Sequence, residues 1–180
     1  MGLIEGTAAE GGIGIKGRLS ITTFKPDGTV RDQREGDNVT CVAGLTAIAA
    51  ALVWSGIQDV AANQGVTTPT YLTPLWGAIG TGTGTVASTD TALFTEFSRV
   101  QVGAGASVPA TATINAQTTW QFYFTQPAAT ATITEAGVFA NAVGTSGAGS
   151  MMDHWAFSPT ITFLSTDTLL LQVSFSISGV

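Results

Sequence analysis

Apolar and polar residues alternate most clearly in the C-terminal part of the chain. Three such runs follow one another between Thr130 and Ile177, separated by breaks rich in Gly, Ser, Thr and Asp. In the last run the apolar positions are spaced by two residues: Leu169, Leu171, Val173, Phe175 and Ile177. A period of two is the pattern of a β-strand with one buried face. These runs therefore predict three successive strands.

One charged residue falls inside this apolar pattern. Glu135 is in step with Ile133 and Phe139, so the first of the three strands is predicted to carry a carboxylate on its apolar face. An unpaired buried charge is very costly, whereas a bidentate Arg–carboxylate pair offsets much of that cost. Arg99 is the only Lys or Arg beyond residue 34. We therefore predict a structural ion pair between Arg99 and Glu135 on neighbouring strands, with Glu96 as the competing partner of Arg99.

Strand patterns also occur earlier in the chain. Residues 13–35 predict a β-hairpin with its turn in the sequence KPDG at 25–28, because Pro presets φ and Gly accepts a positive φ. The return strand is highly polar, which is typical of a sheet edge. Further strands are predicted at 75–79, 97–108 and 112–125.

One helix is predicted, from Val42 to Trp54, because apolar residues recur there at positions i, i+3, i+4 and i+7. Asn38 or Thr40 is its candidate N-cap. This helix stands among about eight short strands without a βαβ rhythm. The pattern therefore predicts a mainly β fold: an antiparallel β-sandwich, jelly-roll-like, with one α-helix and an N-terminal arm and hairpin.

The polar connection at 55–74 is the natural place to divide the chain. Residues 1–65 are predicted to hold the N-terminal arm, the β-hairpin and the helix. Residues 66–180 are predicted to hold the antiparallel β-sandwich. One continuous domain is the alternative.

The composition of the chain is unusual in one respect, because few of its residues are charged. Only 10% of residues are charged, against a typical ~25%. The mean hydropathy is +0.34, yet the longest apolar stretch, 47–54, is far short of the ~20 residues of a membrane span. A surface with few charges is poorly defended against association. We therefore expect a protein that buries much of its surface against copies of itself or a larger assembly.

The net charge of −6 argues against a direct nucleic-acid partner, because nucleic-acid sites are basic. The cations are concentrated near the N-terminus, where they are candidate contacts to an acidic partner: Lys16, Arg18, Lys25, Arg31 and Arg34. Cys41 is the only cysteine, so no intrachain disulfide can form, and it is predicted to be a small buried side chain. No secretory signal pattern follows Met1, so synthesis in a cytoplasm is expected.

Candidate chemistry is sparse. The repeat GTGTGT at 80–85 lacks the Gly-Lys-Ser/Thr ending of a phosphate loop, and a β-loop is the better interpretation. His154 is the only histidine, and Trp155 and Phe157 are predicted on the opposite face of its strand, so it is interpreted as a surface or interface residue. A metal site needs three or four ligands, which no motif supplies. We expect no catalytic, cofactor-binding or metal-binding residues.

Three local patterns occur in a fixed order along the chain. The first is a polar hairpin followed by N-V-T…G-L and an Ala/Leu-rich helix, at 38–52. The second is W-G-A-I-G-T-G-T-G-T…T-D-T-A-L…E-F-S-R, at 76–99. The third is I-T-E-A-G-V-F, then a Gly-rich loop, H-W-A-F-S-P and L-L-L-Q-V-S-F-S-I, at 133–177. This order resembles small virion structural proteins of tailed bacteriophages, a group that includes capsid decoration (cement) proteins and tail or baseplate-associated proteins.

The resemblance implies a non-enzymatic structural protein made in the host cytoplasm and located on the capsid exterior of the virion. A cement protein would lie over junctions between major capsid subunits and strengthen the head against the pressure of its DNA. Its partners would be the major capsid protein and copies of itself, with a homotrimer as the first expectation, and no membrane. The alternatives are a tail, collar or baseplate component, a carbohydrate- or host-receptor-binding β-sandwich, and a hydrolase.

Overall fold

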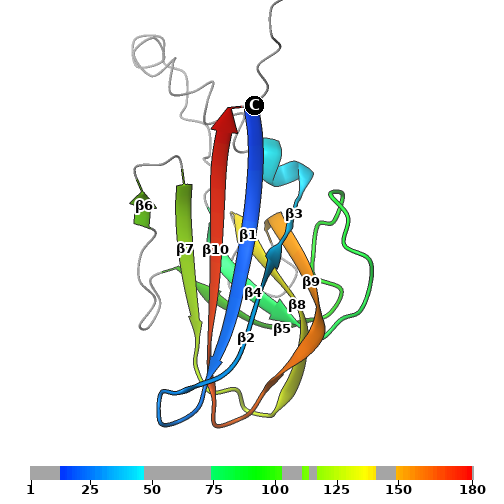
Figure 1. Ribbon diagram of the computed structural model, residues 1–180. Coiled ribbons are helices and arrows are strands. Elements are labelled where there is room, and N and C mark those ends of the chain that lie inside the picture. The colour runs from blue at the N-terminus through cyan, green and yellow to red at the C-terminus, as the bar shows by residue number, and fades with distance from the viewer. Residues whose placement is uncertain (1–12, 47–73, 103–110, 114–116, 141–148, 180) are drawn as a thin grey trace, which may run out of the picture.

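The computed structural model describes residues 13–46, 74–102, 111–113, 117–140 and 149–179, and these form two antiparallel β-sheets with one short helical segment (Figure 1). Each sheet has five strands. Sheet A has the order β2-β1-β10-β7-β6 and sheet B the order β3-β9-β8-β4-β5. The predicted mainly β, antiparallel fold is confirmed at this level.

The strand bounds are as follows. Sheet A contains β1 (Ile13–Phe24), β2 (Val30–Asp37), β6 (Thr111–Thr113), β7 (Gln117–Phe124) and β10 (Thr168–Gly179). Sheet B contains β3 (Val39–Thr40), β4 (Pro74–Gly80), β5 (Glu96–Gln101), β8 (Ala131–Ala140) and β9 (Ser150–Phe163). The two-residue strand β3 and the separation of β6 from β7 were not predicted.

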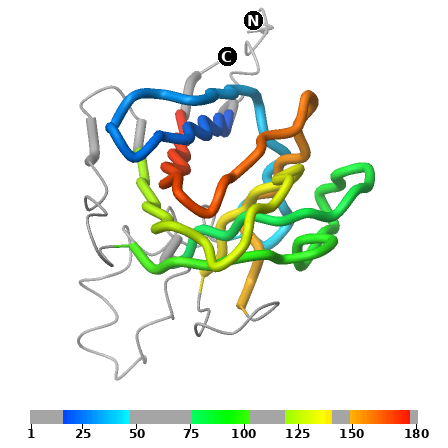
Figure 2. Tube along the Cα trace, turned by 90° about the horizontal axis from the view of Figure 1, so that it is seen from below, coloured from blue at the N-terminus to red at the C-terminus, as the bar shows by residue number. Residues whose placement is uncertain are grey.

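The main core lies between the two sheets, because one face of each sheet is apolar. Sheet A contributes the alternating positions of β10 and the aromatic residues of β7, of which Phe122 is fully buried. Sheet B contributes residues such as Val138 and Ile161, which belong to the same cluster. Seen from below, β1, β2 and β10 lie in one layer and β8, β4 and β5 in the other (Figure 2). The alternating apolar residues predicted for the last strand therefore lie in this core.

The N-terminal hairpin is an integral part of sheet A. Strand β1 pairs with β10 along its whole length, from Ile13 opposite Gly179 to Phe24 opposite Thr168. Strand β2 forms the edge of the sheet, as its polarity predicts, and Gly28 in the turn has the expected positive φ of 81°. Strand β1, from the predicted N-terminal part, and strand β10, from the predicted sandwich part, therefore belong to the same sheet.

Several predicted segments extend beyond the described residues. The helix begins at Val42 and is described to Thr46, and its continuation to Trp54 lies outside the described residues. The N-terminal arm lies outside them as well, as does most of the connection at 55–74. Strand β5 ends at Gln101, where the sequence predicts a strand to 108, and 103–110 are not among the described residues.

A register irregularity in sheet B decides where Glu135 points. The pairing of β8 with β9 shifts between Ile133 and Glu135. As a result Ile133 packs in the main core, together with Val138, whereas Glu135 lies on the opposite, outer face. The prediction that Ile133 and Glu135 share a face is therefore wrong, because the irregularity breaks the period of two.

Candidate functional site

The outer face of sheet B carries a buried cluster of titratable groups. Glu135 on β8 and His154 on β9 are both fully buried, and the His154 Nε2 atom lies 3.0 Å from Glu135 Oε2. The other ring nitrogen, Nδ1, lies 2.7 Å from Oδ2 of Asp90, which belongs to the loop between β4 and β5. Because each ring nitrogen faces a carboxylate oxygen, the arrangement is satisfied when both nitrogens carry a proton and both donate.

Glu135 also holds the backbone of the loop at 81–95. Its Oε1 atom accepts hydrogen bonds from the N–H groups of Gly82 (3.0 Å) and Thr95 (2.8 Å), and its Oε2 atom accepts one from Phe94 (2.9 Å). Burial by itself would raise the pKa of Glu135, but the hydrogen bonds from His154 and from these three N–H groups lower it below its usual value. The buried carboxylate is therefore ionised at neutral pH and fixes both ends of the loop.

Two glycines of the repeat at 80–85, Gly80 and Gly82, lie against the Glu135 carboxylate. A Cβ atom at Gly80 would lie 2.5 Å from Glu135 Oε1. A Cβ atom at Gly82 would lie 2.6 Å from the same oxygen and 2.4 Å from Cβ of Phe94. Only glycine lets the loop backbone approach the carboxylate so closely. The predicted β-loop is confirmed, and at Gly82 the backbone N–H binds an internal anion rather than a phosphate.

Apolar contacts close the loop over the face of sheet B. Leu93 is 7% exposed and packs in a second cluster with Ala78, Phe139, Met151 and Cys41. The Phe94 ring lies 5.0 Å from the His154 ring, centroid to centroid. The loop at 81–95 therefore covers part of the outer face of sheet B and shields the charged cluster.

The predicted ion pair between Arg99 and Glu135 is replaced by two other pairs. Arg99 makes a bidentate contact with Glu96, with Nε to Oε1 and a second nitrogen to Oε2 both at 2.8 Å. The Arg99 guanidinium also lies over the ring of Phe139, 4.1 Å from its centroid. The prediction that Glu135 is buried is correct, but its side-chain partner is His154. Arg99 and Glu135 are separated by β4, where they face different residues, so the nearer Glu96 is the partner of Arg99.

His154 was interpreted as a surface or interface residue, and this was wrong because it is fully buried. His154 pairs with Gly137, two residues from Glu135 in the same unbroken stretch of register, so both side chains lie on the outer face of sheet B, where the loop at 81–95 covers them. Sequence reasoning missed Asp90, which lies 64 residues from His154 along the chain. The sequence contained one hint of this cluster: a single histidine and a glutamate predicted to be buried, each of which requires a hydrogen-bond partner.

Asp153 is a fully buried acid that the sequence analysis does not predict. Its side chain is 0% exposed, and no hydrogen-bond partner for either carboxyl oxygen is found among the described residues. Burial raises its pKa to about 8, so the neutral form predominates at pH 7. Burial also raises the pKa of the nearby Cys41 to about 12, with contributions from Asp153 and Asp90. Cys41 is therefore an unreactive thiol, and its predicted burial is confirmed.

The candidate cationic contacts of the hairpin are largely engaged in ion pairs within the chain. Lys16 lies 3.2 Å from Asp37, and Arg18 lies 2.7 Å from Glu35. Arg31 makes a bidentate contact with the fully buried Asp167, at 2.5 and 3.0 Å, and Arg34 contacts Asp32. Lys25 lies in the exposed turn, without a carboxylate partner among the described residues. The structure brings four of these cations, Lys16, Arg18, Arg31 and Arg34, together on β1 and β2, interleaved with carboxylates.

The contacts of this cluster join the loop at 81–95 to strands β8 and β9. Both ring nitrogens of His154 contact carboxylates, so neither contacts the hydroxyl that a Ser-His-Asp arrangement would require. In the part of the chain that the structure describes, no group of three or more His, Cys, Asp and Glu residues could hold a metal ion. The described segments also contain no helix long and apolar enough to cross a membrane.

Comparisons of this chain with protein-family models, with curated proteins and with solved structures found no match.

Proposed function

We propose that this protein is a non-enzymatic structural subunit of a bacteriophage virion, best suited to decorating the capsid. In this role it bridges major capsid subunits on the outside of the head and stabilises the shell. A homotrimer and a jelly-roll-like connection of the two sheets are part of the same proposal. It is made in the host cytoplasm and joins the particle there.

The observation that carries this proposal is the low charge of the chain, together with the way in which its charges are used. Only 10% of residues are charged, and most of the described ones are bound to one another. Aromatic side chains are meanwhile left at the surface beside β5, where Phe94 and Phe97 are 40% and 37% exposed. Exposed aromatic residues in surroundings of low charge are typical of contact surfaces. The resemblance to virion proteins in the three sequence patterns supports the same role.

The proposal is tested by locating the protein in purified particles. Electron cryo-microscopy of virions is expected to show its density repeated over the capsid lattice, and quantitative mass spectrometry is expected to give hundreds of copies. Heads lacking the protein should lose their DNA at lower temperature than complete heads. Density confined to one vertex, with about six or twelve copies, would contradict capsid decoration and support a tail, collar or baseplate role. Absence from the particle would contradict both roles.

A further inference from the structure

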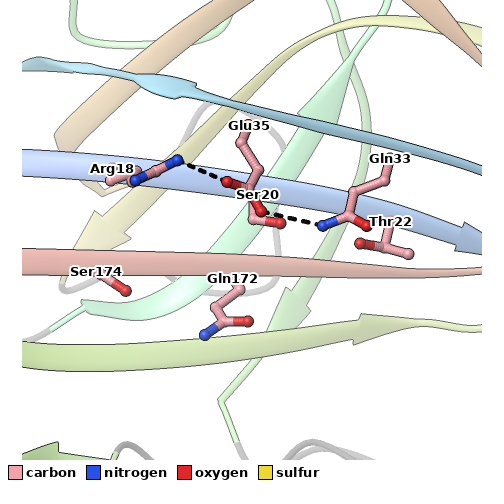
Figure 3. Close-up of a pocket in the computed structure, with 7 residues that line it drawn as sticks. All are labelled: Arg18, Ser20, Thr22, Gln33, Glu35, Gln172 and Ser174. Atoms are coloured by element: carbon pink, nitrogen blue, oxygen red, sulfur yellow. Dashed lines mark hydrogen bonds and ion pairs between the residues drawn. The ribbon is translucent and has the colours of Figure 1, made fainter.

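A polar groove runs along the outer face of sheet A (Figure 3). It has a volume of about 260 Å³ and is open to solvent. Three adjacent strands line it, with β1 in the middle, β2 on one side and β10 on the other. Its lining residues are Arg18, Ser20, Thr22, Gln33, Glu35, Gln172 and Ser174.

The groove exists because the central strand carries short side chains and its neighbours carry long ones. In the pairing register, Ser20 lies between Glu35 on β2 and Gln172 on β10, and Thr22 lies opposite Gln33. The longer side chains rise on both sides of the two hydroxyls. For this reason Thr22 is only 9% exposed although it is on the outer face of the sheet.

The groove has no net charge. Its one cation, Arg18, donates to its one anion, Glu35, at 2.7 Å, and Gln33 Nε2 donates to the other oxygen of Glu35 at 3.1 Å. Lys16 on β1 and Asp37 on β2, farther along the same strands, also pair with each other. A groove with this balance has no electrostatic preference for an anion or a cation.

Several polar groups of the groove are not used within the protein. For the side chains of Ser20, Thr22 and Gln172, no hydrogen-bond partner is found among the described residues. A hydroxyl donates and accepts, and an amide presents a donor and an acceptor side by side. The groove therefore offers paired donors and acceptors at neighbouring positions.

We propose that this groove binds an uncharged saccharide through one sugar ring. Vicinal ring hydroxyls, each both donor and acceptor, match the paired polar groups of the groove. A peptide strand is a poorer fit, because the backbone groups of β1 already pair with β2 and β10 and no sheet edge is available in the groove. The volume of about 260 Å³ is below the roughly 300–1,000 Å³ of sites for drug-sized ligands, which suits one ring. For about a dozen non-hydrogen atoms in an open site, we expect a dissociation constant of about 1–10 mM.

The test is a titration of the ¹⁵N-labelled full chain, followed by NMR. The probes are methyl α-glucoside, methyl α-mannoside, methyl β-galactoside and N-acetylglucosamine, each added to about 50 mM, well above the expected dissociation constant. At least one probe is expected to shift the backbone signals of Ser20 and Thr22 and the side-chain amides of Gln33 and Gln172 in a saturable manner. Because the ligand is uncharged, raising the salt concentration should leave the affinity unchanged.

Two matched variants locate the binding site. Ser20→Gln fills the floor of the groove and is expected to weaken binding at least about tenfold. Ser176→Gln is the control, since it makes the same substitution on the same face of sheet A, on the neighbouring strand β10 and outside the groove lining. It should bind as the unmodified protein does. Well-dispersed spectra of both variants verify that the fold is intact.

Three results would each overturn the proposal. One is the absence of saturable shifts with all four sugars. Another is an unchanged affinity in the folded Ser20→Gln variant. The third is salt-dependent binding of an acidic sugar such as sialic acid in preference to the neutral ones, which would indicate a charged ligand. None of these results bears on the position of the protein in a virion, so this proposal and the proposed function fail independently.

Discussion

The outer faces of the two sheets differ in how far their polar groups are exposed to water. On sheet B, the loop at 81–95 covers part of the face, and the polar groups beneath it, Glu135 and His154, are fully buried and bonded to one another. On sheet A, the outer face is exposed, and its ion pair between Arg18 and Glu35 has side chains that are 62% and 44% exposed. Water solvates the charges on the open face, whereas on the covered face the protein must supply every partner itself.

This difference decides how much each charge matters for stability. Ion pairs exposed to water contribute about 0–1 kcal/mol, because water competes for both partners. Removing one member of a buried network costs far more, because the remaining members stay buried without a partner. The following predictions test this contrast, from the largest expected effect to the smallest.

The largest effect is expected from Glu135→Gln. Both carboxylate oxygens of Glu135 accept hydrogen bonds from Gly82, Thr95 and Phe94, whereas a Gln side chain has one accepting oxygen and one donating nitrogen. The substitution also leaves His154 without its anionic partner. The free energy of unfolding, measured with urea, should fall by about 3–5 kcal/mol. The control is Glu35→Gln on the open face, which should change it by no more than about 0.5 kcal/mol. Equal losses in the two variants would refute the contrast between the faces.

Asp153→Asn should change how stability depends on pH. The pKa of Asp153 is about 8 in the folded protein, against an ordinary value of 3.8. Between these values the folded protein keeps a proton that the unfolded chain has lost, so this group makes stability fall as pH rises from about 4 to about 8. The variant should therefore gain stability relative to the unmodified protein across this range, by on the order of a few kcal/mol in total.

Urea unfolding at a series of pH values measures this effect. The lowered pKa of Glu135 contributes stability that is lost only as the pH falls through its folded pKa, and both proteins share this term. The control is Asp37→Asn, an acid on the open face whose side chain is 66% exposed. Its stability curve should run parallel to that of the unmodified protein. If the Asp153→Asn curve does so as well, burial does not control the protonation of Asp153.

Gly82→Ala should cost about 1–3 kcal/mol, because its methyl group would overlap Glu135 Oε1 and Cβ of Phe94. The loss is again measured by urea unfolding. A double variant with Glu135→Gln provides the sharper test, since both changes disturb the same contact. Its loss should be smaller than the sum of the two single losses. Strict additivity would show that Gly82 and Glu135 act separately.

Arg31→Met should have a smaller effect, a loss of about 1–2 kcal/mol. The substitution removes the bidentate partner of Asp167, which is costly because Asp167 is fully buried. The loss is limited because the Arg31 side chain is 31% exposed, so water replaces part of the contact. Arg18→Met is the matched control, with the same substitution in the exposed pair with Glu35, and should fall within about 0.5 kcal/mol of the unmodified protein. A larger loss in Arg18→Met than in Arg31→Met would reverse the expected order.

Local patterns in the sequence determined much of the fold. The alternation in β10 predicted a strand with one buried face, and residues of that face lie in the main core. The turn at 25–28 and the polar edge strand β2 were also recognised, because turn chemistry and edge polarity act over a few residues. The pattern predicts the burial of Glu135, but on the face of Ile133, whereas the residue is buried on the opposite face beneath the loop at 81–95.

The tertiary structure alone decided the partners. Asp90 and Glu135 meet at His154 because the register of β8 with β9 places Glu135 and His154 on one face, and because the loop at 81–95 folds over that face. The groove on sheet A likewise depends on which residues of β2 and β10 stand beside Ser20. A period of two fixes which side chains are buried but carries no information on register or on contacts between distant segments. Register and distant contacts are set by the pairing of whole strands. For this reason the sequence predicts a buried carboxylate but does not predict that His154 is its partner.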